Sequence, residues 1–295
     1  MKKNYRTLED SVISLFPINK KITWKGQQFT VLNSDKPTSI SKGEPKTDVY
    51  LKLQDNTTKE TVELKISCKL EGSNEFQENK IKASRAKQIW GDNWRDIIQN
   101  SALSIKEKFE NTETYFPRGF GRTKETQYTN GWKVEIASKS RELAVKLELT
   151  DKDIRDKIYK GTTLDETKKN CLVNGEVIKN SGVAEYMLVT TLQKIKSINK
   201  SSDILNLLIP IDTYPILPHY IIFTGNNYRV LKDKHDGNRP LGVQVIWTAN
   251  KEKNILEKCL KFDCPLDDNF SAKQIALRTK EEISKLGENF TKNMI

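Results

Sequence analysis

An alternating stretch between residues 61 and 69 constrains the fold more than any other part of the sequence. Apolar and polar residues take turns there, in the order Val62, Glu63, Leu64, Lys65, Ile66, Ser67, Cys68 and Lys69. Successive side chains of a β-strand point to opposite faces, so the apolar set faces a core and the polar set faces away. A second short run, residues 48–53, precedes it across a polar connection. The two runs predict an antiparallel hairpin with Asp48 at the start of its first strand.

The rest of the chain predicts an α/β protein. Apolar spacing predicts helices over 4–16, 75–90, 94–109 and 271–286, and a mostly helical segment over 138–196. Strands are expected at 24–32, 204–211, 219–224, 228–231 and 242–248. Strands at both ends of the chain predict a central mixed β-sheet flanked by helices, with a mostly helical insertion. We expect a core over 1–135, a helical subdomain over 136–200, and returning strands with a final helix over 201–295.

Composition narrows the classes of function. Fifty Lys and Arg residues against 39 Asp and Glu give a net charge of +11, which favours a polyanionic partner; a lysine-rich soluble protein is the alternative. No apolar run approaches the roughly 18 residues of a membrane span, and the N-terminus lacks a secretory apolar stretch. We therefore expect a cytoplasmic protein without a membrane partner. Four scattered cysteines and two histidines argue against a zinc site and against Cys–His or Ser–His–Asp catalysis.

The predicted hairpin carries a specific chemistry. We expect the hairpin to bring the Asp48 carboxylate alongside Glu63. Two carboxylates this close repel each other unless a cation lies between them. Hard oxygen ligands suit Mg²⁺, and Lys65 on the same face as Glu63 can assist deprotonation of a water that attacks phosphorus. The alternative is a solvated hairpin that carries ordinary surface charges.

These residues resemble the signature of PD-(D/E)xK nucleases, as found in type II restriction endonucleases. Asp48 is followed, after fourteen intervening residues, by Glu63-Leu64-Lys65. The usual proline directly before the aspartate is absent: Pro45 lies three positions upstream, and Thr47 takes its place. The resemblance covers about residues 1–110, because these nucleases place one helix before the first strand and another after the Glu-x-Lys strand.

The resemblance implies a sequence-specific endonuclease that hydrolyses both strands of DNA with Mg²⁺. Asp48 and Glu63 would hold the metal, and Lys65 would act on the attacking water. A third acidic ligand would come from Glu9, with Asp10 and Glu44 as alternatives. The family also implies a homodimer and a cognate DNA methyltransferase. Another nuclease with the same core, acting in repair, recombination or on modified DNA, and a non-catalytic DNA-binding protein remain as alternatives.

Several polar residues are candidates for DNA contact. Some lie on or after the second strand of the hairpin, and the others lie in polar segments further along the chain, where turns recruit the same residue types for backbone reasons. The candidates are Ser67, Lys69, Ser73, Asn74, Gln77, Asn79, Lys80, Arg118, Arg122, Asn226, Asn227, Arg229 and Arg239.

Overall fold

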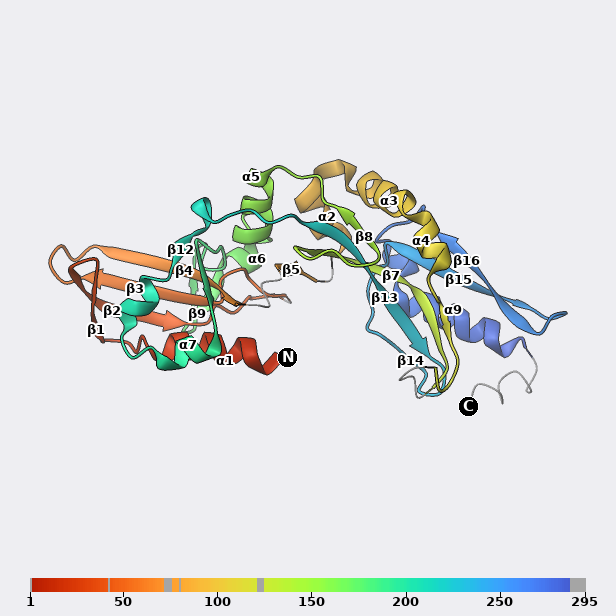
Figure 1. Ribbon diagram of the computed structural model, residues 1–295, viewed down its shortest axis with the longest axis horizontal. Coiled ribbons are helices and arrows are strands. Elements are labelled where there is room, and N and C mark those ends of the chain that lie inside the picture. The colour runs from red at the N-terminus through yellow and green to blue at the C-terminus, as the bar shows by residue number, and fades with distance from the viewer. Residues whose placement is uncertain (1, 42, 72–75, 80, 121–124, 287–295) are drawn as a thin grey trace. The chain divides into compact units, whose positions relative to one another are not determined.

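A computed structural model describes residues 2–41, 43–71, 76–79, 81–120 and 125–286. The chain forms two compact units, and each unit combines two separate segments. Unit 1 comprises Met1–Glu75 and Leu149–Leu217, and unit 2 comprises Phe76–Glu148 and Pro218–Ile295. This division differs from the boundaries at residues 135 and 200 expected from the sequence, because strands far apart in the chain pair with one another. Figure 1 labels helices and strands of both units.

Unit 1 is a mixed sheet with helices. Its elements are α1 (Lys2–Ser14), β1 (Lys21–Trp24), β2 (Gln27–Asp35), β3 (Val49–Asp55), β4 (Thr61–Leu70), α5 (Asp151–Asp153), the π-helix η2 (Ile154–Lys160), α6 (Glu166–Lys169), β9 (Cys171–Val173), β10 (Glu176–Ile178), β11 (Tyr186–Thr190), α7 (Leu192–Ser197), α8 (Ser201–Leu205), β12 (Ile209–Pro210) and the 3-10 helix η3 (Ile211–Thr213). The described strands of its main sheet follow the order β1-β2-β3-β4-β11-β12, with β11 parallel to β4 and the other pairs antiparallel. The expected α/β class and the predicted hairpin β3–β4 are confirmed.

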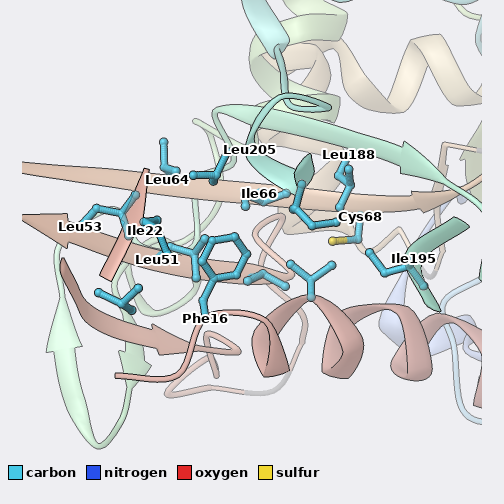
Figure 2. Packing of buried hydrophobic residues seen from close by; sticks show 14 of the residues in the cluster. Phe16, Ile22, Leu51, Leu53, Leu64, Ile66, Cys68, Leu188, Ile195 and Leu205 are labelled. Carbon is cyan, nitrogen blue, oxygen red and sulfur yellow. The ribbon is translucent and has the colours of Figure 1, made fainter. Parts of the chain in front are cut away.

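Helix α1 covers one face of this sheet. Leu8 and Val12 lie one helical turn apart, Phe16 follows the helix, and Pro17 prevents its continuation. All three apolar side chains are fully buried in one cluster with Leu51 of β3 and with Leu64, Ile66 and Cys68 of β4. Figure 2 shows Phe16, Leu51 and Ile66 among the side chains in the layer between α1 and the strands. Leu64, Ile66 and Cys68 therefore face the layer that α1 covers, whereas Val62 at the start of the strand is exposed. The polar residues of β4 face the other way.

Phe16 tests this packing. We expect Phe16→Ala to lower the free energy of unfolding by about 3–5 kcal/mol, because a fully buried aromatic side chain leaves a cavity. Denaturant unfolding followed by circular dichroism measures the change. The matched control is Ile18→Ala, since Ile18 is 51% exposed and its loss should change stability by about 0.5 kcal/mol or less. Equal effects of the two substitutions would contradict the described packing.

Unit 2 is built on a second sheet. Its elements are β5 (Gln77–Glu78), α2 (Ala83–Trp90), the 3-10 helix η1 (Gly91–Asn93), α3 (Trp94–Ser104), α4 (Lys106–Asn111), β6 (Tyr115–Phe116), β7 (Gln127–Ala137), β8 (Ala144–Lys146), β13 (Tyr220–Arg229), β14 (Lys234–His235), β15 (Val243–Asn250), β16 (Ile255–Lys261), the 3-10 helix η4 (Asp268–Phe270) and α9 (Ala272–Ser284). The described strands follow the order β14-β13-β7-β15-β16, β5 and β6 also pair with β7, and β8 pairs with β13. Helix α9 packs against β15 and β7.

A glycine allows the long strand β7 to pair with β15. Gly131 has a φ of 144°, and a Cβ atom there would lie 2.2 Å from the carbonyl oxygen of Val243. No other residue fits this close approach of two backbones. Gly131 therefore fixes where β15 joins the sheet.

Several expected elements are wrong. Residues 138–196 are not mostly helical: they contain β8, β9, β10 and β11 besides short helices. The strand expected at 204–211 is α8 followed by the short β12, and the polar stretch after Thr224 continues β13. The expected single sheet is divided, because β11 and β12 join β4 while β13 and β15 pair with β7. Short apolar runs do not reveal whether they form helix or strand, or which sheet they join.

Candidate functional site

The register of the hairpin decides which polar residues meet. Val49 pairs with Ile66, and Lys52 pairs with Glu63. Asp48, directly before Val49, therefore lies at the level of Ser67. Glu63 is four residues away along β4, about 13 Å at the rise of a strand. The expectation that Glu63 lies alongside Asp48 is wrong.

The turn of the hairpin explains this register. The Asp55 carboxylate accepts hydrogen bonds from the backbone N–H groups of Thr57 and Thr58, at 2.6 and 3.0 Å. The Asp55 N–H donates to the Glu60 carbonyl, so the turn is centred between Thr57 and Thr58. Had it been centred two residues earlier, Glu63 would face Asp48.

The Asp48 carboxylate contacts the next polar pair along β4. Its Oδ2 atom accepts hydrogen bonds from the Cys68 backbone N–H at 2.8 Å and from the Ser67 hydroxyl at 3.3 Å. The Lys69 ammonium lies 4.0 Å from the same oxygen. About a quarter of the Asp48 and Lys69 side chains is exposed, so a solvent-borne group can reach them. A carboxylate, a hydroxyl and an ammonium thus meet at the end of the β3–β4 pair.

Glu63 and Lys65 have other partners. The Lys65 ammonium forms an ion pair of 2.7 Å with Glu185, and its side chain is only 10% exposed. Glu63 lies beside the buried Tyr50 side chain; burial, together with this carboxylate, raises the pKa of Tyr50. Lys65 shares a strand face with Ser67, but its charge is directed to Glu185 and not to Asp48.

Helix α1 adds a second carboxylate, that of Glu9, on which the Asp48 charge acts. The buried Glu9 side chain forms an ion pair with Lys36, which directly follows β2. Burial raises the pKa of Glu9, the hydrogen bond from Lys36 opposes this shift, and the Asp48 charge adds to it. Glu9 therefore lies within the electrostatic reach of Asp48. We call Glu9, Lys36, Asp48, Ser67 and Lys69 the Asp48 cluster.

The other two candidates for a third acid are placed differently. Asp10 is exposed, and its Oδ2 atom lies 3.8 Å from Nε of Arg6, one helical turn away. Glu44 is also exposed, and its charge acts on Lys36. Of the three candidates, Glu9 is the buried one whose charge is coupled to Asp48. Lys36 was missed from the sequence, because a lysine after a strand carries no distinctive pattern.

The Cys68 thiol, between Ser67 and Lys69 in the sequence, does not belong to the Asp48 cluster and is unsuited to act as a nucleophile. Cys68 is buried on the opposite face of β4, against the layer that α1 covers. Burial, with the adjacent Asp48 charge, raises the pKa of Cys68 well above its usual value. The thiol stays protonated at neutral pH, and thiolate chemistry is thereby disfavoured.

Two carboxylates of the Asp48 cluster, those of Asp48 and Glu9, are the groups that could hold a magnesium ion. Among the described residues, no group of three or more His, Cys, Asp or Glu side chains is arranged to hold a metal. Mg²⁺ does not require three protein ligands, because it is usually held by one or two carboxylates together with waters and substrate phosphates. Asp48 and the desolvated Glu9 supply two such carboxylates.

The remaining candidates for DNA contact that lie in unit 2 fall into two groups. Some are engaged within the fold: Asn226 is fully buried and donates to the carbonyls of Asp236 and Gly237, Asn227 accepts from Thr129, and Arg229 forms an ion pair with Asp236. The contacts of Asn226 and Arg229 hold the β13–β14 turn, and that of Asn227 joins β13 to β7. Asn226 is too buried to act as the expected base reader, and the side chains of Asn227 and Arg229 have partners within the fold.

The second group is accessible. Asn79 and Arg118 are exposed, Arg239 is partly exposed, and Gln77 is exposed while donating to Glu135 at 3.1 Å. Ser73, Asn74, Lys80 and Arg122 lie outside the described residues. Ser67 and Lys69 belong to the Asp48 cluster.

Along the described part of the chain, the helices are all too short or too polar to cross a bilayer. Comparison with family models, with curated proteins and with solved structures found no match for this chain.

Proposed function

We propose that the chain is a Mg²⁺-dependent endonuclease that hydrolyses double-stranded DNA at the Asp48 cluster. The observation that carries this proposal is the contact of the Asp48 carboxylate with Ser67 and with Lys69. The Asp48 charge also acts on a second carboxylate, that of Glu9 on α1. The catalytic lysine is then Lys69 and not Lys65, and Glu9 takes the place that the sequence suggested for Glu63.

Each residue has a role in phosphodiester hydrolysis. Asp48 and Glu9 hold the metal, which when bound neutralises charge on the phosphate oxygens and favours deprotonation of a water. The Lys69 ammonium lies within reach of Asp48, where it orients the attacking water and stabilises negative charge in the transition state. The Ser67 hydroxyl donates a hydrogen bond to Asp48 in the metal-free protein and can donate to a phosphate oxygen once DNA is bound.

The PD-(D/E)xK resemblance supports the same cluster after a shift along β4. Asp48 precedes the first strand of an antiparallel hairpin, α1 precedes the sheet, and a polar-x-Lys pair follows on the neighbouring strand. The two residues are Ser67 and Lys69 of the stretch Ser67-Cys68-Lys69, which follows Asp48 after eighteen intervening residues. It lacks the acidic residue of the signature, and the Glu9 carboxylate compensates for that loss. A restriction-endonuclease-like core in unit 1 is therefore part of the proposal.

The remaining parts of the proposal concern specificity and partners. A type II restriction enzyme recognises a short sequence, usually as a two-fold homodimer that cuts one strand with each protomer. It acts in the cytoplasm beside a methyltransferase that protects the host DNA. The net charge of +11 suits a DNA partner. Another nuclease of this family would share the chemistry but not the fixed site.

Digestion of phage DNA tests the proposal. With Mg²⁺ we expect discrete fragments whose ends map to one short sequence, because each cut requires recognition. With Ca²⁺ in place of Mg²⁺ we expect binding without cleavage, since the larger ion holds the ligands loosely. Excess chelator should stop cleavage, and Asp48→Asn protein is the control for a contaminating nuclease.

The outcomes separate the alternatives. Cleavage only of branched or modified DNA would indicate a different nuclease of the same family. DNA binding without cleavage under any of these metals would indicate a non-catalytic binding protein. Full cleavage in chelator would exclude the metal mechanism.

A further inference from the structure

Lys36 is the positive charge that balances the Glu9 carboxylate of the Asp48 cluster. Its ammonium forms an ion pair with Glu9, and the negative charges of Asp48 and Glu44 also act on it. The Glu9 side chain is only 10% exposed. A carboxylate with so little water around it requires a compensating cation, and in this structure Lys36 supplies it.

The backbone around Lys36 is fixed on both sides. The Lys36 N–H donates to one Asp35 carboxylate oxygen at 2.8 Å, and the other oxygen accepts from the Asn174 N–H at 2.7 Å. Two residues later, Thr38 pairs with Leu172 through two backbone hydrogen bonds of 2.9 Å. This segment is thereby attached to the β9–β10 hairpin, which holds the base of the Lys36 side chain beside Glu9.

The ammonium end of the Lys36 side chain can change conformation, whereas the Lys36 backbone is held by hydrogen bonds. About half of the side chain is exposed, so the ammonium can turn into solvent without disturbing packed residues. A flexible four-carbon stem permits such a movement at low cost. The contact with Glu9 is therefore one that another cation can displace.

We propose that Lys36 is a tethered cation that occupies the Glu9 carboxylate in the metal-free protein and must leave when Mg²⁺ binds. Both cations require the same desolvated carboxylate, so they compete for it. Lys36 thus raises the metal concentration at which the site fills, and it keeps the cluster neutralised until then. This inference rests on the proposed function, because it concerns the metal site of that nuclease.

Binding of Mn²⁺ alone, without DNA, tests the inference through the electron paramagnetic resonance signal of free Mn²⁺. We expect Lys36→Met to bind on the order of tenfold more tightly than the wild type, the size expected when one competing ion pair of about 1.4 kcal/mol is removed. Lys59→Met, in the exposed hairpin turn, removes the same charge from unit 1 and should leave the affinity unchanged. Lys36→Arg keeps a competing charge and should stay near the wild type.

Asp48→Asn separates the two possible failures. If the wild type binds Mn²⁺ through Asp48 and Lys36→Met binds no more tightly, or more weakly, the competition is wrong while the metal site stands. If no variant shows Asp48-dependent binding, the metal site of the proposed function fails and the inference fails with it. Thermal melting of each variant without metal verifies that the proteins are folded.

Discussion

Lys69→Met should lower the rate of DNA cleavage by about 10²–10⁴-fold, the usual contribution of a group that assists proton transfer. The ammonium lies 4.0 Å from Asp48, and its loss removes an interaction that forms fully only in the transition state. Methionine keeps most of the aliphatic stem, so folding and DNA affinity should change little. Cleavage rate and gel-shift affinity are measured on the same duplex.

Lys65→Met is the matched control for this experiment. Lys65 lies on the same strand face, two residues from Ser67, but its ion pair is with Glu185, which is 45% exposed and can be solvated when the lysine is lost. We therefore expect cleavage close to the wild-type rate and a stability change of about 1 kcal/mol or less. The reverse pattern, with cleavage lost in Lys65→Met and kept in Lys69→Met, would assign catalysis to the Glu-x-Lys stretch after all.

Substitution of Asp48 should have two separable effects, one on the rate of DNA cleavage and one on the free energy of unfolding. Both Asp48→Asn and Asp48→Ala should reduce cleavage by about 10³-fold or more, because stabilisation by a bound metal is worth several kcal/mol. Asparagine retains an oxygen that can accept from the Cys68 N–H, whereas alanine leaves that donor unpaired. Asp48→Ala should therefore cost about 1–3 kcal/mol of folding free energy, and Asp48→Asn less.

Metal-free DNA binding provides an independent measurement on the same variants. A carboxylate facing a phosphate repels it until a cation intervenes, so both Asp48 variants should bind DNA more tightly than the wild type in chelator. Unchanged affinity would indicate that Asp48 does not face the phosphate backbone. An equal loss of stability in the two variants would indicate that the contact with Cys68 does not support the fold.

The hairpin was predictable from the sequence, but its register was not. Alternation of apolar and polar residues determines which face of β4 is buried, and Asp48 does precede a strand that pairs with it. Any shift by two residues preserves this alternation, so Glu63-x-Lys65 and Ser67-x-Lys69 fit it equally well. The turn determines which register forms, because the Asp55 carboxylate accepts hydrogen bonds from the backbone of Thr57 and Thr58. Aspartate side chains commonly bond the backbone two residues on, so the information on the register lay in the turn and not in the alternation.

The division of the chain into two units rests on long-range strand pairs, which local sequence patterns do not reveal. Cys68 and Leu188 lie side by side in neighbouring parallel strands although 119 residues separate them. Asn226 illustrates the same difficulty on a smaller scale, because asparagine in a polar stretch suits a base contact as well as a buried turn. Only its partners across β13 and β14 distinguish the two roles. Glu9, in contrast, was reachable from the sequence, since the apolar spacing of α1 predicts which residues approach the sheet.

The parallel pairing of β4 with β11 has a consequence for synthesis of the chain on the ribosome. The strand that carries Ser67 and Lys69 ends at Leu70, and its partner begins only at Tyr186. At elongation rates of about 5–20 residues per second, the intervening stretch takes roughly 6–23 s to emerge. During that interval β4 is an open sheet edge, which other chains can pair with. Nascent protein should therefore be most prone to aggregate before residue 186 is made, and slowing translation between Leu70 and Tyr186 should lower the yield of soluble protein.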